Sequence, residues 1–529
     1  MLDIIIKNAT VVDGTGTAAF TADIAVQGDK ITDIGNIDPA EAKLTIDASG
    51  MLVCPGFIDS HSHSDEAYIV NPLAESKLRQ GITTEVVGNC GSSPFPLSDE
   101  VRERYQEDVK NWGLVIDWTS AEEYFHKVQD AKPAVNIVPL VGQGTLRAAV
   151  LGYDNRPPKP DEMQKMKDLL REALQSGCWG FSTGLIYPPG CFSTLDELAE
   201  LATSIKPLGG FYTSHIRSEG DTLIEAIEEA ISIARASGVA AEIAHLKAAG
   251  VRNWGKAELA INIIMDAREK EGLDIGFDRY PYTASSTGLS SLLPEWAHAG
   301  GHKKTVEFIA DPDTSNRLLD EMEANLEGQH GWQSVILANA ATPDFEQFEG
   351  LSISEIANVK GVSPAILAIT VMLKSKFNAS ICSFTMSKPE TDMILNHPLC
   401  AVCTDATARA TTGPLSKGKP HPRTFGSFPK FFRNYVKESR TLTLPEAVAR
   451  TTALPAERFG INQRGILKPG YYADILIIDW ESFTDTATYD NPISLALGLN
   501  CVIVNGGMVF NQEKYTGTRS GRILTPSRT

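Results

Sequence analysis

GFIDSHSHSD, residues 56–65, joins an apolar strand to a pair of histidines. Phe57 and Ile58 predict a short buried strand, and His61 and His63 follow it with one residue between them. Residues i and i+2 of a strand point to the same side, so both imidazoles can reach one metal ion beyond the strand's end. The ordinary alternative is a pair of surface histidines in a serine-rich turn.

The long middle of the chain alternates short apolar runs with helical patterns. Eight runs are predicted strands: 57–61, 83–90, 134–141, 178–184, 211–215, 240–246, 274–280 and 399–405. Helices are predicted between them, at 161–176 and at 221–237, where Asp221 is expected to cap the helix and Gly238 to end it. Eight such pairs predict an α/β fold, a closed (β/α)8 TIM-type barrel. An open doubly wound sheet is disfavoured because no glycine-rich phosphate loop follows the first strand.

Two other regions stand apart from this alternation. About 120 residues separate the seventh and eighth runs, far more than an ordinary connection between a strand and a helix. We expect residues from about 285 to 395 to form a subdomain inserted in a barrel of residues 56–464, and we hypothesise that it acts as a lid. Short β-rich runs at both ends predict one small β-sandwich domain, built from residues 1–55 and 465–529.

The composition narrows the class of protein. The 529 residues carry a formal net charge of −18 without a basic tract, so neither nucleic acid nor a membrane surface is an expected partner. The eight cysteines lack a dense spacing pattern, which predicts free thiols in a reducing compartment. Charged residues interrupt the apolar N-terminus, MLDIIIKNATVVDG, so it predicts neither a secretory signal nor a membrane span. We therefore expect a cytoplasmic protein.

Residues suited to metal binding and proton transfer gather at the predicted strand ends, where such barrels carry their chemistry. Six of them fall at five of these ends: His61, His63, Cys90, His215, His245 and Asp405. Each alone has an ordinary explanation as a buried polar histidine, a small buried thiol or a helix cap. Their joint placement favours a metal site, since the remaining histidines lie in predicted helices, loops or the insertion: His126, His298, His302, His330, His397 and His421.

These features resemble the amidohydrolase superfamily, of which PGFIDSHSH (55–63) is the opening signature. The resemblance implies a (β/α)8 barrel with a small β-sandwich made from both chain ends. Most metal-bridging members carry a carboxylated lysine on the fourth strand, but the fourth run here, CWGFSTG (178–184), has no lysine, and Cys90 ends the second run. That departure resembles the N-acyl-D-amino-acid deacylases, or D-aminoacylases. Three further stretches share this likeness, which covers nearly the whole chain: GFSTGLIYPPG (180–190), EIAHLK (242–247) and HPRTFGSFPKF (421–431).

The resemblance implies zinc-dependent hydrolysis of the amide bond of N-acyl-D-amino acids, releasing a carboxylate and a D-amino acid. One tight zinc site would be formed by Cys90, His215 and His245, and a second, weaker position by His61 and His63. Asp405 would act as general base, taking a proton from the attacking water and delivering it to the leaving nitrogen.

Four residues are candidates for substrate binding. Arg423 in the HPR motif could bind the substrate carboxylate with both arms of its guanidinium, and the alternative is a surface arginine. Tyr187 and Tyr282 resemble the family's substrate-contacting tyrosines, although either could serve packing alone. Lys247 could contact a carboxylate of the substrate, or be an ordinary surface lysine.

Alternative functions stay open at this point. A cyclic-amide hydrolase of the dihydroorotase or hydantoinase type is disfavoured by the missing fourth-strand lysine, and a D-dipeptidase differs only in its leaving group. A non-catalytic scaffold barrel is disfavoured because all ligands and the strand-eight aspartate are present. The family's usual Ser-Asp-Gly is replaced by Thr404-Asp405-Ala406, so the preferred side chain and acyl group, like the oligomeric state, are not predicted.

Overall fold

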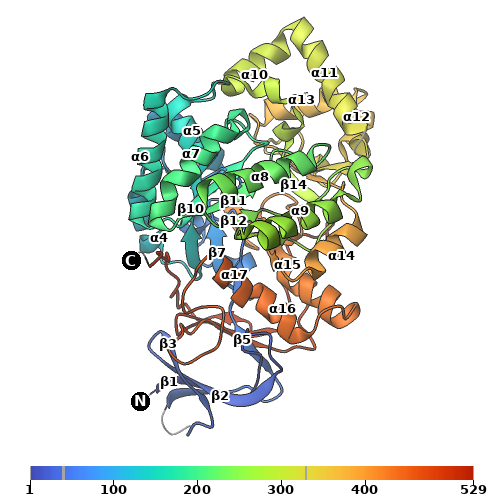
Figure 1. The fold of residues 1–529 in the computed structure, drawn as a ribbon. Helices are drawn as coiled ribbons and strands as arrows, with labels where there is room; N and C mark the ends of the chain where they lie inside the picture. The colour runs from blue at the N-terminus through green and yellow to red at the C-terminus, as the bar shows by residue number, and fades with distance from the viewer. Residues whose placement is uncertain (1, 39–41, 328–329, 528–529) are drawn as a thin grey trace.

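The computed structural model describes residues 2–38, 42–327 and 330–527, and it has a barrel at its centre (Figure 1). Eight barrel positions are filled in chain order by β6 (Phe57–Asp59), β7 (Ile82–Val87), β8 (Asn136–Pro139) with β9 (Val141–Gly142), β10 (Gly180–Gly184), β11 (Phe211–His215), β12 (Ala241–Ile243), β13 (Ile275–Arg279) and β17 (Cys400–Val402). Neighbouring strands pair in parallel along β6-β7-β8 and along β9-β10-β11-β12-β13-β17. The predicted (β/α)8 barrel is confirmed.

The barrel closes between its first and last strands through the loops that carry the site. Ser62 and Ala406 form a parallel bridge beyond β6 and β17. The amide of Asp405 donates to the carbonyl of His61 at 2.9 Å. The HSH motif and the strand-eight aspartate are therefore joined by backbone hydrogen bonds.

A buried ion cluster lies beneath this junction. The Lys77 ammonium is fully buried and lies 2.9 Å from a carboxylate oxygen of Asp59 and 2.9 Å from one of Glu85. It also donates to Thr404 Oγ1 at 2.7 Å. A buried charge is strongly destabilising without partners, and here one cation joins β6, β7 and the end of β17. The cluster thus fixes the strand ends from which the site projects.

Helices surround the barrel, and their apolar faces pack on the strands. They are α1 (Ala67–Val70), α2 (Glu75–Leu78), α3 (Asp99–Val109), α4 (Ala121–Ala131), α5 (Gln143–Leu151), α6 (Pro160–Ser176), α7 (Leu195–Ile205), α8 (Leu223–Ser237), α9 (Lys256–Glu271), α14 (Lys388–Asn396), α15 (Arg423–Phe432), α16 (Leu444–Thr451) and α17 (Ala453–Arg458). One predicted cap is wrong. The N-cap of α8 is Thr222, without a side-chain hydrogen bond, because Asp221 is paired with Arg252 instead.

Both chain ends build one sheet below the barrel (Figure 1). Its strands are β1 (Leu2–Val11), β2 (Phe20–Gln27), β3 (Lys30–Gly35), β4 (Ala42–Asp47), β5 (Leu52–Pro55), β18 (Ile475–Ile478), β19 (Leu499–Val504), β20 (Gly507–Asn511) and β21 (Lys514–Tyr515). β18 pairs with β5, which joins the two ends, and the apolar side chains of both form a separate core. The predicted domain limits stay predictions, and residues 1, 39–41 and 528–529 of these segments lie outside the described residues.

The insertion between β13 and β17 lies above the barrel (Figure 1). It contains β14 (Ser285–Gly288), β15 (Val335–Asn339), β16 (Ser380–Ser383), α10 (Gly301–Ala310), α11 (Pro312–Glu327), α12 (Ile353–Lys360) and α13 (Pro364–Lys374). The three strands form an antiparallel sheet, and the insertion has its own apolar core. Residues 328–329 of the predicted subdomain fall outside the described chain.

Over the described ranges, no single helix combines the length and apolar character needed to cross a membrane. Only the bent pair α12 and α13 passes that test jointly.

Candidate metal centre and its cavity

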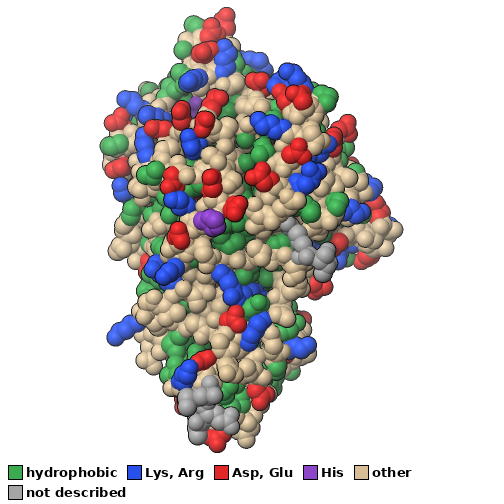
Figure 2. Space-filling model, turned by 90° about the vertical axis from the view of Figure 1, so that its left-hand side faces the viewer, with side chains coloured by type: hydrophobic (Ala, Val, Ile, Leu, Met, Phe, Trp, Pro, Cys, Tyr) green, Lys and Arg blue, Asp and Glu red, His purple; other side chains and the backbone are tan. Residues whose placement is uncertain are grey.

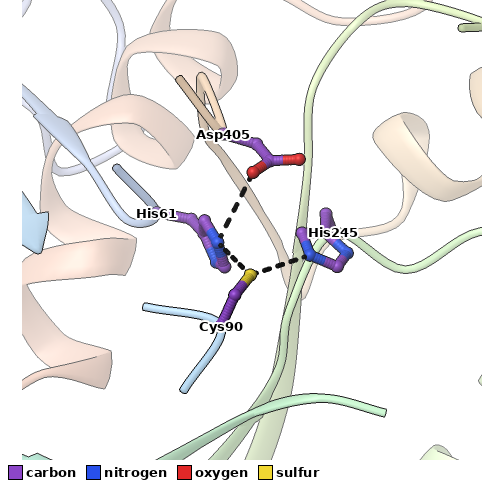
Figure 3. A group of neighbouring side chains, drawn as sticks. All are labelled: His61, Cys90, His245 and Asp405. Atoms are coloured by element: carbon purple, nitrogen blue, oxygen red, sulfur yellow. Dashed lines mark hydrogen bonds and ion pairs between the residues drawn. The ribbon is translucent and has the colours of Figure 1, made fainter. Parts of the chain in front are cut away.

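The thiol of Cys90 lies at the centre of a histidine cluster where the barrel strands end. Its Sγ is 3.3 Å from Nε2 of His61, 3.4 Å from Nδ1 of His215 and 3.5 Å from Nε2 of His245. Figure 3 shows the rings of His61 and His245 on either side of this sulfur, with the Asp405 carboxylate beside His61. Nitrogen atoms of three imidazoles therefore surround one sulfur.

The backbone aims these side chains by adopting an uncommon conformation. Cys90, His245 and Asp405 have φ values of 51°, 37° and 48°, each just past the end of its strand. Left-handed backbone is uncommon outside glycine and is concentrated at functional sites, where the surrounding structure maintains it. Three such residues facing one point indicate a site that the fold holds under strain.

The protonation of the cluster suits a metal ion. Burial lowers the pKa of His61 well below its usual range and that of His215 to about 3, so both rings are neutral and offer a lone pair. Burial also raises the pKa of the Cys90 thiol, which would lose its proton beside a cation. The ligand atoms of His61, Cys90, His245 and Asp405 lie within 4.8 Å of one another, and this sulfur and nitrogen donor set fits Zn²⁺.

Glu219 lies behind two of the histidines. Its Oε1 is 2.9 Å from Nδ1 of His245 and 3.8 Å from Nε2 of His215. Each ring therefore turns one nitrogen toward Cys90 and the other toward this carboxylate, an arrangement that orients metal-binding histidines. Lys247, a predicted substrate-binding residue, forms an ion pair with Glu219 and lies 2.7 Å from Nδ1 of His245.

Asp405 is held between two cationic or polar partners. Its Oδ2 is 2.8 Å from Nη1 of Arg423, and its Oδ1 is 3.1 Å from Nε2 of His63. Burial raises the pKa of this carboxyl group, but Arg423 and the neighbouring imidazoles outweigh that effect and hold the pKa well below its usual range. Asp405 is therefore ionised at neutral pH.

The structure separates the two histidines of the opening motif. His61 is as close to Cys90 as His215 and His245 are, whereas the partly exposed His63 lies beside Asp405. Among the described residues, His63 belongs to neither group that could hold a metal ion. His61 Nε2 also lies 3.7 Å from Oδ1 of Asp405, so both histidines of the motif face this carboxylate, and His61 lies beside Cys90 as well.

A cavity of about 640 Å³ opens above the cluster, with the insertion forming part of its wall. Tyr187 lines it, and its hydroxyl lies 2.9 Å from Oγ1 of Thr287. Tyr282 does not line it along the described chain, because its hydroxyl donates to the carbonyl of Pro422 behind the wall. Tyr280 lines the cavity, and its buried hydroxyl has no described hydrogen-bond partner. A substrate contact by Tyr282 stays a prediction.

Several residues of the cavity were missed by the reading of the sequence. Glu219 follows His215 by four residues in HIRSEG, and Tyr280 ends the seventh predicted strand, so both carried a local signal. Arg104, His298 and His302 line the cavity from helices and loops, where nothing in the local sequence marks them.

Comparison with known proteins agrees with this geometry. The sequence profile of the amidohydrolase family matches residues 44–510. N-acyl-D-glutamate deacylase of Alcaligenes xylosoxydans xylosoxydans is 34% identical over 528 residues, covering 99% of this chain and 96% of that protein. D-aminoacylase of the same organism is 32% identical, covering 99% and 97%.

The solved structures include a similar chain. The crystal structure of N-acyl-D-glutamate deacylase from Bordetella bronchiseptica, complexed with zinc and a phosphonate inhibitor, has a TM-score of 0.84 at 33% identity and covers 99% of both chains. The family profile, the full-length relatives and this structure lead to one conclusion: the chain belongs to the amidohydrolase family and, within it, to the group of the N-acyl-D-amino-acid deacylases.

Proposed function

We propose that this protein hydrolyses the amide bond of N-acyl-D-amino acids with the help of zinc, releasing a carboxylate and a D-amino acid. The observation that carries the proposal is the convergence of three imidazoles on the Cys90 thiol, 3.3–3.5 Å away, with an ionised Asp405 beside them. Relatives named N-acyl-D-glutamate deacylase and D-aminoacylase align along 99% of the chain.

Zinc would be held by Cys90, His215 and His245, with His61 and His63 offering a second position. The distance of 3.3 Å between His61 Nε2 and Cys90 Sγ supports a further role for His61 at the first position. A zinc ion bound there supplies a Lewis acid that polarises an amide carbonyl and makes water more acidic. The fixed left-handed backbone of Cys90 and His245 pre-organises the ligands.

Asp405 would transfer the protons of the reaction. It is ionised, so it can accept a proton from the attacking water and then deliver that proton to the leaving nitrogen. Without this delivery an amine anion would have to leave, which is prohibitive. Arg423 and His63 hold the carboxylate at 2.8 and 3.1 Å, in position for both transfers.

The substrate's α-carboxylate would be bound by Arg423, assisted by the tyrosines and Lys247. Arg423 also donates to the carbonyl of Ser286 at 3.2 Å, which fixes its guanidinium at the cavity wall. The unpartnered hydroxyl of Tyr280 is free to donate to an anionic oxygen. Tyr187 follows β10, and its hydroxyl is held by Thr287. It would contact the substrate from the end of that strand.

Other features support the proposed setting. β10 carries no lysine in GFSTG, which disfavours a cyclic-amide hydrolase with a carboxylated lysine, whereas D-dipeptides remain candidate substrates. All eight cysteines are free thiols, in keeping with a cytoplasmic location. The insertion forms part of the cavity wall, and in this proposal it acts as a lid. On the face shown in Figure 2, acidic and basic side chains are interspersed. The described residues of that face form no continuous basic patch of the kind that binds nucleic acid, in keeping with a small-molecule substrate.

The dependence on zinc tests this proposal. Protein depleted of metal with a chelator should release no D-methionine from N-acetyl-D-methionine, and added Zn²⁺ should restore the release. Amino-acid release is measured by chromatography, and bound zinc by atomic emission. Full activity in protein shown to contain no metal would contradict the proposal.

A further inference from the structure

The cavity contains a second region of distinct chemistry, between α3 and α10. At about 640 Å³, it has the size of pockets that hold drug-sized ligands, about 300–1,000 Å³. An N-acetyl group and a short side chain would leave part of it unfilled. We call this region the arginine pocket, which is lined by Val101, Arg104, Tyr105, Tyr153, His302 and Phe377.

The charge of Arg104 distinguishes this pocket from the rest of the cavity. Three cationic side chains line the cavity: Lys247, Arg423 and Arg104. Lys247 is paired with Glu219 and Arg423 with Asp405. Over the described part of the chain, no carboxylate forms an ion pair with Arg104. Arg104 is therefore the one of these three cations without an ion-pair partner among the described side chains.

The surroundings of Arg104 hold its guanidinium in place without neutralising it. Its Nη2 lies 3.0 Å from Nε2 of His302, and its guanidinium carbon lies 4.2 Å from the centre of the Tyr153 ring. The His302 ring in turn stacks on Phe377, with centroids 4.2 Å apart. Burial and the charge of Arg104 lower the pKa of His302 to about 3, so this histidine is neutral and can accept the hydrogen bond. The remaining donors of the guanidinium are available to a ligand.

We propose that Arg104 binds a second carboxylate of the substrate, separated from the scissile amide by an apolar arm. The planar fork of an arginine matches a carboxylate, and the apolar walls of Val101, Tyr105 and Phe377 match methylene groups. The second carboxylate is carried either by the side chain of the D-amino acid or by the acyl group. This inference rests on the proposed function and specifies its substrate class.

Matched substrate pairs test the inference. The side-chain pair is N-acetyl-D-glutamate and N-acetyl-D-glutamine, and the acyl pair is N-succinyl-D-leucine and N-butyryl-D-leucine. We expect the zinc enzyme to prefer the doubly charged member of one pair, and Arg104→Gln to lower kcat/KM for that member by roughly 10- to 100-fold, mainly through KM. The uncharged partner should change by less than about 2-fold. Arg104→Lys should recover part of the loss, because it keeps the charge without the fork.

The control variant is Arg102→Gln. Arg102 lies on the same helix but is exposed and paired with Asp99 at 3.0 Å, so its loss should change neither member of a pair. Equal losses for charged and uncharged substrates in Arg104→Gln, or no preference in the wild type for either charged member, would overturn the inference. The pair that responds identifies whether the side chain or the acyl group carries the carboxylate.

A binding experiment distinguishes failure of this inference from failure of the proposed function. N-acetyl-D-glutamate and N-acetyl-D-glutamine can be titrated calorimetrically, as can the acyl pair, into zinc-loaded Asp405→Asn protein with and without Arg104→Gln. Hydrolysis of none of the four substrates by the wild type would refute the proposed function. The inference then stands if binding of a charged member weakens with Arg104→Gln, and falls if binding is unchanged.

Discussion

Asp405 combines ionisation with a fixed position, and both are needed for proton transfer. Its carboxylate is ionised and lies between Arg423 and His63, at 2.8 and 3.1 Å. Replacing it by Asn keeps the shape but removes the proton acceptor, so kcat should fall at least about 100-fold. Bound zinc should stay unchanged, as measured by atomic emission. Substantial residual turnover in Asp405→Asn would refute its role as general base.

Glu219 acts, in this account, through the histidines rather than on the substrate. Glu219→Gln removes the charge that faces His245 and His215 and leaves Lys247 without its partner. Zinc affinity, measured by competition with a chelator, should weaken roughly 10- to 100-fold. Glu229→Gln is the matched control. Glu229 lies on α8, the helix that follows Glu219, and it pairs with Arg217 rather than with a histidine. Equal zinc affinity in both variants would show that Glu219 does not position the ligands.

Individual residues were predictable where strand periodicity governs their position. Cys90, His215 and His245 are placed by the ends of strands, so their meeting follows from the barrel itself. Tyr280, which lines the cavity, was not predicted. It is followed by a tight turn, in which the amide of Tyr282 donates to the Tyr280 carbonyl at 2.9 Å and the alternation of the strand ends. No local pattern encodes a turn of that kind.

The strand β12 and the helix α17 are joined by a buried ion pair whose strength depends on pH. Glu242 on β12 accepts from Arg458 on α17 at 3.1 Å. Burial raises the pKa of Glu242 from 4.5 to about 7, although Arg458 opposes the shift. The folded state therefore binds the Glu242 proton more tightly than the unfolded state. The contribution of this proton binding to the free energy of unfolding is full below pH 4.5 and is lost as the pH rises through about 7, when the buried carboxyl becomes charged.

Glu242→Gln should remove this pH dependence. Between pH 5 and pH 8, the apparent Tm of the wild type should fall relative to that of the variant, by roughly 1–3 °C. The measurement is thermal unfolding followed by fluorescence, and the difference between the two proteins isolates this group from the others that titrate. Parallel curves for the two proteins would contradict the account.

Among the elements, all eight barrel strands were predicted, because alternating apolar runs and helical patterns are local signals. The cap of α8 was not, since Asp221 has a stronger partner in Arg252, 31 positions along the chain. Long-range partners of this kind also bring α3 and α10 together at the cavity through the hydrogen bond between Arg104 and His302. The arginine pocket is therefore visible only in the folded chain.

At the scale of the whole molecule, a cavity lies between the barrel and an insertion that has its own core. The buried Lys77 cluster secures the strand ends below the cavity, and the insertion forms part of its wall. Like any cavity lined by L-residues, this one is chiral, so it can bind the two enantiomers of a substrate with different affinities. The proposed function requires that this surface distinguish the two enantiomers of an N-acyl amino acid.

The rate of hydrolysis of N-acetyl-D- and N-acetyl-L-amino acids by the zinc-loaded protein tests the central claim most directly. Release of the free amino acid is measured for the two enantiomers of glutamate, aspartate, methionine and leucine derivatives under identical conditions. We predict release from D-substrates and none above background from their L-enantiomers. Hydrolysis of the L-enantiomers at equal or higher rates, or of neither enantiomer, would contradict the account.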